Sequence, residues 1–265
     1  MYQLKPRSSV KTVQSVQKAL RIIEALGNEA HPLNLTQLCE KIDLNMSTTY
    51  RILQTLRSSG FVHYDRDSNR YRLGLKIFKM GNAALYGLDF RAEARPLLEE
   101  LVAKCNETAN LAVLDEGEVV YIEQVESPNI MKMLARLGSR LPAYSTGGGK
   151  VLLAYLEEEE LARYLRNRPL LPLTPSTITS PLRLREELAL IRDLGYGVDR
   201  EETEPGVKCV AAPIQNYSGR IIAALSVSGP SIRLADEYLV EKLAPLVKEY
   251  AGKISSKLGH KLSLV

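Results

Sequence analysis

The sequence contains few of the residues that build disulfide frameworks and metal centres. Only three cysteines occur, Cys39, Cys105 and Cys209, and they are widely spaced. An odd number of distant cysteines favours free thiols in a reducing compartment over a disulfide framework. The three histidines form no cluster with the cysteines, so a zinc site is not expected. We predict that the protein holds no metal and no other cofactor.

Long apolar segments are also missing. No apolar run approaches the roughly 20 residues that a membrane-spanning helix needs. The first residues, MYQLKPRSSVKTVQSV, lack the apolar core of a secretion signal. Internal repeats and low-complexity tracts are absent. A chain of 265 residues, of which 45% are hydrophobic, suits two globular domains, and we expect them in the cytoplasm without a membrane partner.

Short amphipathic helices are predicted near the N-terminus. Apolar residues at helical spacing indicate a first helix over residues 13–26 and a second from Leu35 to Ile42. After a tight break, a third helix begins near Ser47. It is expected to end at Gly60, because glycine readily adopts the left-handed conformation that closes a helix.

A basic β-hairpin follows these helices. Residues 61–64 and 71–73 read as two strands around a turn at 65–69, so the helices and hairpin together predict a winged helix-turn-helix. A helical subdomain with a merely solvated polar face would show the same spacing. The charge argues against it, since residues 1–74 hold 11 Lys and Arg against 6 Asp and Glu, whereas residues 75–265 hold 24 against 25. Concentrated positive charge is typical of a surface that contacts phosphates.

The polar face of the third helix is the candidate for reading operator DNA. It carries hydroxyls, an amide and one charged residue, Arg51, which suit contacts with base edges in a major groove. Arginines on the hairpin are expected at phosphates. The DNA-binding residues that we predict are Ser47, Thr48, Thr49, Tyr50, Arg51, Gln54, Arg66 and Arg70.

The remainder of the chain predicts an α+β domain. A linker helix over residues 75–88 has more apolar residues than a solvated linker needs, which predicts packing against the first domain or against a second protomer. Helices then alternate with antiparallel strands, including one expected over Met131–Leu137, and this order is typical of a sheet covered by helices. The predicted domains are 10–74, 75–89 and 90–265.

Three consecutive glycines precede a helix in PAYSTGGGK, residues 142–150. We expect a loop here whose backbone N–H groups are open to an anion. The segment is not a Walker A loop, because that motif needs glycine where this chain has Tyr144, and Ser or Thr where it has Val151. Tight packing between a helix and a strand is the other explanation for the glycines.

Over essentially its whole length, the chain resembles the IclR family of transcriptional regulators. The resemblance is carried by LTQLCEKIDLNMSTTYRILQTLRSSGFV with YRLG after the wing, and by LPAYSTGGGKVLLAYL, YGVDREETEPGVKCVAAPI and AALSVSGP. It implies a winged helix-turn-helix, a linker helix and a GAF-like α+β effector-binding domain, assembled as a homodimer or tetramer on double-stranded operator DNA. Such regulators, often repressors, commonly control catabolic operons and respond to a small organic-acid effector.

The resemblance also implies where an effector binds. Backbone N–H groups at the glycines would hold a carboxylate, polar side chains would bond its other oxygens, and apolar residues would form a wall. Gly148 stands where many relatives have a side chain, so the identity of the effector does not transfer. The residues carried over are Ile130, Met133, Leu141, Thr146, Gly147, Gly148, Gly149, Asp199, Val207, Cys209, Ser226 and Ser228.

Two other functions stay open at this point. An enzyme could use Cys209 as a nucleophile, yet no histidine lies near it in the sequence to act as a base, and a cysteine within VKCVAAP is more often a buried apolar residue. A ligand-independent architectural DNA-binding protein would leave the glycines and the inward polar residues unexplained. Ser226, Ser228 and Asp199 could also simply face solvent. We favour a regulator that is not an enzyme.

Overall fold

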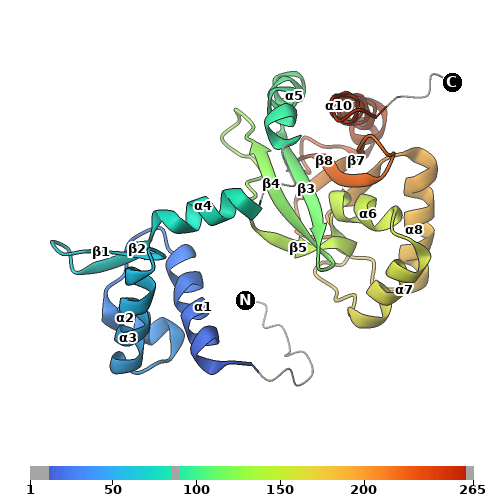
Figure 1. Ribbon diagram of the computed structural model, residues 1–265. Helices are drawn as coiled ribbons and strands as arrows, with labels where there is room; N and C mark the ends of the chain where they lie inside the picture. The colour runs from blue at the N-terminus through green and yellow to red at the C-terminus, as the bar shows by residue number, and fades with distance from the viewer. Residues whose placement is uncertain (1–11, 85–89, 261–265) are drawn as a thin grey trace. The chain divides into compact units, whose positions relative to one another are not determined.

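The computed structural model describes residues 12–84 and 90–260. Contacts between residues divide the chain into two compact units, one within residues 1–88 and the other within residues 89–265 (Figure 1). Among the helices of the described residues, none is long and apolar enough to cross a membrane.

The first unit begins with three helices and a β-hairpin. These elements are α1 (Gln14–Gly27), α2 (Leu35–Ile42), α3 (Met46–Ser58), β1 (Val62–Asp65) and β2 (Arg70–Leu73). Asparagines begin both helices of the central pair. The side chain of Asn34 accepts the N–H of Gln37 at 2.9 Å, and that of Asn45 accepts the N–H of Thr48 at 2.9 Å. Asp43 turns the chain between them with a left-handed φ of 50°.

One face of each helix forms the core of this unit. Ile22 of α1, Leu38 of α2 and Leu53 of α3 are completely buried, and Val62 of the hairpin packs in the same cluster. Gly60 has a φ of 79°, as the sequence predicts for the residue that closes α3. The predicted winged helix-turn-helix is therefore confirmed.

A further helix, α4 (Leu75–Ala84), follows the hairpin. Residues 85–88 of the predicted linker helix lie outside the described residues. The apolar side chains of Leu75 and Phe78 are 81% and 69% exposed.

The second unit is a sheet between helices. Its elements are α5 (Phe90–Cys105), β3 (Thr108–Asp115), β4 (Glu118–Val125), β5 (Arg140–Pro142), a 3₁₀ turn (Ala143–Ser145), α6 (Gly147–Ala154), α7 (Glu158–Asn167), α8 (Pro181–Leu194), β6 (Gly197–Arg200), β7 (Val207–Gln215), β8 (Ile221–Pro230), α9 (Asp236–Tyr238), a π-helical turn (Leu239–Leu243) and α10 (Ala244–Lys257). The six strands lie in the order β5-β4-β3-β8-β7-β6, and every neighbouring pair is antiparallel. The predicted α+β architecture is confirmed.

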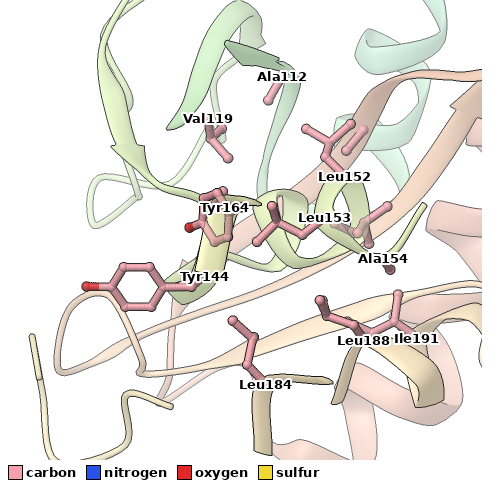
Figure 2. Close-up of a cluster of buried hydrophobic side chains, with 14 of the residues drawn as sticks. Ala112, Val119, Tyr144, Leu152, Leu153, Ala154, Tyr164, Leu184, Leu188 and Ile191 are labelled. Carbon is pink, nitrogen blue, oxygen red and sulfur yellow. The ribbon is translucent and has the colours of Figure 1, made fainter. Parts of the chain in front are cut away.

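The two faces of the sheet are covered by different helices. α5 and α10 pack on one face, whereas α6 packs on the other and is itself covered by α8 (Figure 1). Figure 2 shows Leu152 of α6 directed toward Ala112 and Val119 of the sheet, with Leu184 and Leu188 of α8 on the other side of the helix. Burial of these side chains seats α6 on the middle of the sheet.

The prediction of a strand over Met131–Leu137 is wrong. These residues have no regular structure, and β5 comes later, pairing with β4 over three residues only. A strand needs a neighbouring strand to which its backbone can hydrogen-bond. Here the backbone of Tyr121 on β4 instead forms hydrogen bonds with Gly138 and Ser139, which follow the segment. Within the segment Ala135 is buried, but Met131 and Leu137, which the alternation places on the same face, are 64% and 55% exposed, so the alternation reflects no sheet face.

Candidate functional site

The exposed face of α3 carries most of the residues predicted to contact DNA bases. Ser47, Tyr50 and Arg51 are exposed, and Thr48 and Gln54 are partly exposed. Because α3 is the second helix of the helix-turn-helix, this is the face that such a domain directs into a major groove.

Thr49 does not belong to this face. Its side chain is completely buried, and its hydroxyl donates to the carbonyl oxygen of Asn45 at 3.0 Å. The prediction of a base contact is wrong for this residue, because it lies on the side of α3 that packs on the core.

The two predicted arginines of the hairpin have different surroundings. Arg66 is exposed within the turn between β1 and β2. Arg70 is partly buried, and its guanidinium donates to the carbonyl oxygen of Pro32 at 2.8 Å. Arg70 thus ties the hairpin to the segment before α2, while Arg66 is free to meet a phosphate.

In the second unit, the three glycines form the first turn of α6 and not a loop. Thr146 caps the helix, and its hydroxyl oxygen accepts the N–H of Gly149 at 2.9 Å. An added Cβ on Gly149 would lie 2.3 Å from the carbonyl oxygen of Ala143, so this position requires glycine for packing. A Cβ on Gly148 would meet only the Cβ of Ala224 at 3.7 Å, an ordinary contact.

The N-terminus of α6 faces β6 and β7, the two strands at one edge of the sheet. A Cβ on Gly147 would lie 3.2 Å from the sulfur of Cys209 and 3.5 Å from the backbone nitrogen of Asp199. Since successive side chains alternate across a sheet, the contact between Gly148 and Ala224 also places Ser226 and Ser228 on the face toward α6. Both serines are buried, at 4% and 5% exposed.

Strand register brings the predicted polar residues together. Asp199 of β6 lies opposite Cys209 of β7, and Cys209 lies opposite Ser228 of β8. Asp199 is 4% exposed and accepts the N–H of Glu202 at 2.7 Å, so it is not part of a solvated acidic edge.

A buried ion cluster lies behind this polar face. Lys150 of α6 is completely buried, and its Nζ contacts Glu187 of α8 at 3.0 Å and also Glu202. Among the described residues, the second oxygen of the Glu202 carboxylate, Oε2, is buried without a hydrogen-bond partner. Two carboxylates thus contact the ammonium group, and its charge also acts on the nearby carboxyl group of Asp199.

Burial shifts the pKa values at this face. It raises the pKa of Asp199 to about 7, and the negative charge of Glu202 acts in the same direction. Burial likewise raises the pKa of Glu202, which Lys150 opposes. The pKa of Cys209 is raised to about 12 by burial and by the charge of Asp199, so this thiol stays protonated at neutral pH and is a poor nucleophile.

The family of this chain follows from comparison with known proteins. Residues 82–256 match the family described as "Bacterial transcriptional regulator IclR C-terminal", and residues 15–66 match the "IclR helix-turn-helix domain". The chain belongs to the IclR family. It is a DNA-binding transcriptional regulator with a C-terminal effector domain.

Individual members of the IclR family resemble this regulator over nearly their whole length. The transcriptional regulator KdgR of Escherichia coli (strain K12) is 38% identical over 249 residues, which cover 94% of each chain. The transcriptional repressor AllR of the same strain is 35% identical over 251 residues, covering 95% of this chain and 92% of AllR. An IclR homolog from Microbacterium hydrocarbonoxydans, complexed with 4-hydroxybenzoate, is 27% identical with a TM-score of 0.81, covering 92% of this chain and 98% of that chain.

The apolar residues expected at the effector site of this IclR-family regulator are scattered. Ile130 is fully exposed, so the structure contradicts its place in an apolar wall. Leu141 packs against the core beneath α6, and Met133 and Val207 are partly buried. Ile130 directly precedes the segment Met131–Leu137, which has no regular structure, so no sheet directs its side chain toward a wall.

Sequence reasoning missed several polar side chains on the same face. Asn110 of β3 is 1% exposed and donates to the hydroxyl of Ser228 at 3.1 Å, and Gln124 of β4 donates to the amide oxygen of Asn110 at 2.7 Å. Tyr121, which is buried, has its pKa raised by burial and by the charges of Cys209 and Asp199. An asparagine that opens an apolar strand, as in NLAVL, was the available signal for Asn110.

We predict that Asp199→Asn changes how stability depends on pH. The folded-state pKa of about 7 lies above the usual 3.8, so the contribution of Asp199 to stability is fully present below pH 4 and is lost as pH rises through 7. Asparagine carries no charge to bury. The variant should match the wild type near pH 4 and exceed its free energy of unfolding by about 1–4 kcal/mol at pH 8.

Urea unfolding at a series of pH values measures this difference. The matched control is Asp193→Asn, at an exposed aspartate on α8, which should leave the difference from wild type constant across the range. Parallel stability curves for wild type and Asp199→Asn would contradict the prediction.

Proposed function

We propose that this regulator is a homodimeric repressor of a catabolic operon, controlled by a small organic acid bound against the sheet of the second unit. The observation that carries the proposal is a set of buried polar side chains at the N-terminus of α6, including Asp199, Ser226 and Ser228. Buried polar groups cost stability unless they are hydrogen-bonded, and apolar residues could fill a core of this size. A ligand that bonds these groups would account for their presence. Repression is supported by its relative AllR, which is a transcriptional repressor.

The exposed face of α3 is the proposed reader of the operator. Arg51 is the only charged side chain there and offers the donors that suit a guanine edge. Ser47 and Thr48, in the first turn, would contact bases or the nearby backbone, and Arg66 would contact a phosphate through the wing.

We predict that Arg51→Ala weakens specific DNA binding by about 1–3 kcal/mol, since it removes a base contact. Gel shifts would use a duplex that the wild-type protein selects from random sequences. Arg163→Ala, at an exposed arginine on α7, removes the same charge from the second unit and should leave the affinity unchanged. Wild-type affinity for Arg51→Ala would refute the assignment.

Assembly as a dimer is supported by apolar side chains that the first unit leaves in solvent. Val16 and Leu20 of α1 are 54% and 51% exposed, in addition to Leu75 and Phe78 of α4. Scattered exposed apolar residues are normal, but rows of them on two helices are typical of an interface. A two-fold dimer would read a pseudo-palindromic operator.

Light scattering at micromolar concentration should therefore return at least twice the chain mass of 29.5 kDa. Phe78→Ser should shift the protein toward the monomer, because it places a hydroxyl in the interface. Tyr217→Ser, at an 80% exposed aromatic residue of the second unit, is the control that should not. A monomeric wild type would contradict the proposal.

The acid is proposed to place its carboxylate at the N-terminus of α6, where the helix dipole favours negative charge. The N–H of Gly149 is occupied by Thr146, and that of Gly147 points at the sulfur of Cys209. The amide of Gly148 is thus the one best suited to a ligand. Ser226 and Ser228 would bond the remaining oxygens of the acid.

Two alternatives fit less well. Enzymatic use of Cys209 is disfavoured by its burial and its raised pKa, and His260 lies by Gly219 in a turn while His31 and His63 belong to the first unit. A DNA-binding protein without a ligand would gain nothing from the buried polar face.

We predict that Ser226→Ala combined with Ser228→Ala abolishes stabilisation by the effector but spares DNA binding without effector. A melting-temperature screen of 2-oxo acids, sugar acids and aromatic acids would first identify an acid that stabilises the wild type and changes its affinity for DNA. Ser255→Ala, at another buried serine of the second unit, is the matched control. An undiminished melting shift in the double variant, or no shift with any acid, would overturn the proposed site.

A further inference from the structure

The polar face beside α6 extends farther than an anion site requires. Two side-chain amides continue it across the sheet. Gln124 of β4 donates to Asn110 of β3, and Asn110 donates in turn to Ser228 of β8. This chain of hydrogen bonds joins three neighbouring strands and ends at a serine already assigned to the effector.

Strand register shows how long this polar face is. Ser226 lies opposite Asn110, which lies opposite Gln124, while Ser228 lies opposite Cys209. Strands β7, β8 and β3 are neighbours in the sheet. Asn110 on β3 therefore lies two strand spacings, about 10 Å, from Cys209 on β7, which is next to the N-terminus of α6. That distance exceeds the reach of a two-carbon acid and suits a chain of about six carbons.

The amides keep hydrogen-bonding capacity that the protein does not use. Each side-chain amide has two N–H donors and a carbonyl oxygen with two lone pairs. The hydrogen bonds among the described residues use one N–H of Asn110, one N–H of Gln124 and one lone pair of the Asn110 oxygen. Uncharged groups that both donate and accept match hydroxyl groups, which also do both.

A purely structural role explains these amides poorly. The next positions along the same face are Ala112 on β3 and Ala224 on β8, so small apolar residues suffice there. Polar side chains that use only part of their hydrogen-bonding capacity stabilise the inside of a domain less well than closely packed apolar side chains. An aromatic or two-carbon acid would leave the remaining hydrogen-bonding capacity of the two amides unused.

We infer that Asn110 and Gln124 are specificity-determining residues that select a carboxylic acid bearing several hydroxyl groups along its chain. The inference rests on the proposed function and adds the chemical class of its effector. The carboxylate lies at the N-terminus of α6, the nearest hydroxyls bond Ser226 and Ser228, and the distal hydroxyls bond the two amides. Binding then pairs every group of the network.

Titration calorimetry with acids matched in length tests this assignment. The probes are gluconate and 2-oxogluconate, hexanoate as the six-carbon acid without hydroxyls, glyoxylate as the two-carbon acid, and 4-hydroxybenzoate. A six-carbon hydroxylated acid should bind at least tenfold more tightly than hexanoate, glyoxylate or 4-hydroxybenzoate.

Variants then separate recognition from folding. Gln124→Leu, at a half-buried position, should weaken binding of the hydroxylated acid about tenfold and narrow its advantage over hexanoate, because one or two hydroxyl contacts are lost. Asn110→Leu should act in the same direction and more strongly. The control is Gln215→Leu, at a half-buried glutamine on β7 whose amide donates to the carbonyl oxygen of Gly219. This variant should change the affinity for neither the hydroxylated acid nor hexanoate.

Each outcome of these titrations either supports or refutes the selection of hydroxylated acids. If glyoxylate, hexanoate or 4-hydroxybenzoate binds as tightly as the sugar acids, and does so through Ser226 and Ser228, the effector site stands and the selection of hydroxyl groups is refuted. An unchanged affinity of Gln124→Leu for the hydroxylated acid refutes it as well. If no acid binds, the proposed function fails together with this inference.

Discussion

The second unit depends on how α6 is held against its sheet, and a buried ammonium group is central to this. Lys150 joins α6 to α8 through Glu187 and to the turn after β6 through Glu202. Removing one partner of a buried ion pair typically costs about 3–5 kcal/mol, because the other charge stays buried and unpaired. Because Gly149 has no side chain, the same helix can pack closely against the carbonyl of Ala143. The N-terminus of α6 is thus fixed by both the ion pairs and close packing.

Holding α6 in this way also sets the electrostatics of the face beside it. The N–H of Glu202, whose carboxylate binds Lys150, donates to Asp199. Burial disfavours ionisation of Asp199 most strongly, and the negative charge of Glu202 acts in the same direction while Lys150 opposes it. An acid bound at the proposed site would meet a helix end that attracts it and a carboxyl group that repels it when ionised. Affinity for an acid and local pH are consequently linked.

Regulation requires that an acid bound in one unit alters the DNA affinity of the other. Such coupling is a free energy, typically about 1–3 kcal/mol, and it acts equally in both directions. The residues proposed to contact the acid and those proposed to contact DNA lie in separate compact units with separate cores. Operator DNA must therefore change the affinity for the acid by the same factor.

Local patterns in the sequence determined the winged helix-turn-helix, the antiparallel strands on either side of α6 and the family, because periodicity, caps such as Gly60 and contiguous motifs are local properties. The tertiary structure decided what depends on partners distant in the chain. The alternation at Met131–Leu137 had no strand beside it, the glycines joined a helix capped by Thr146, and Thr49 turned inward. Asn110 and Lys150 gained their surroundings from strands and helices far away in sequence, since burial and register arise only when the chain has folded.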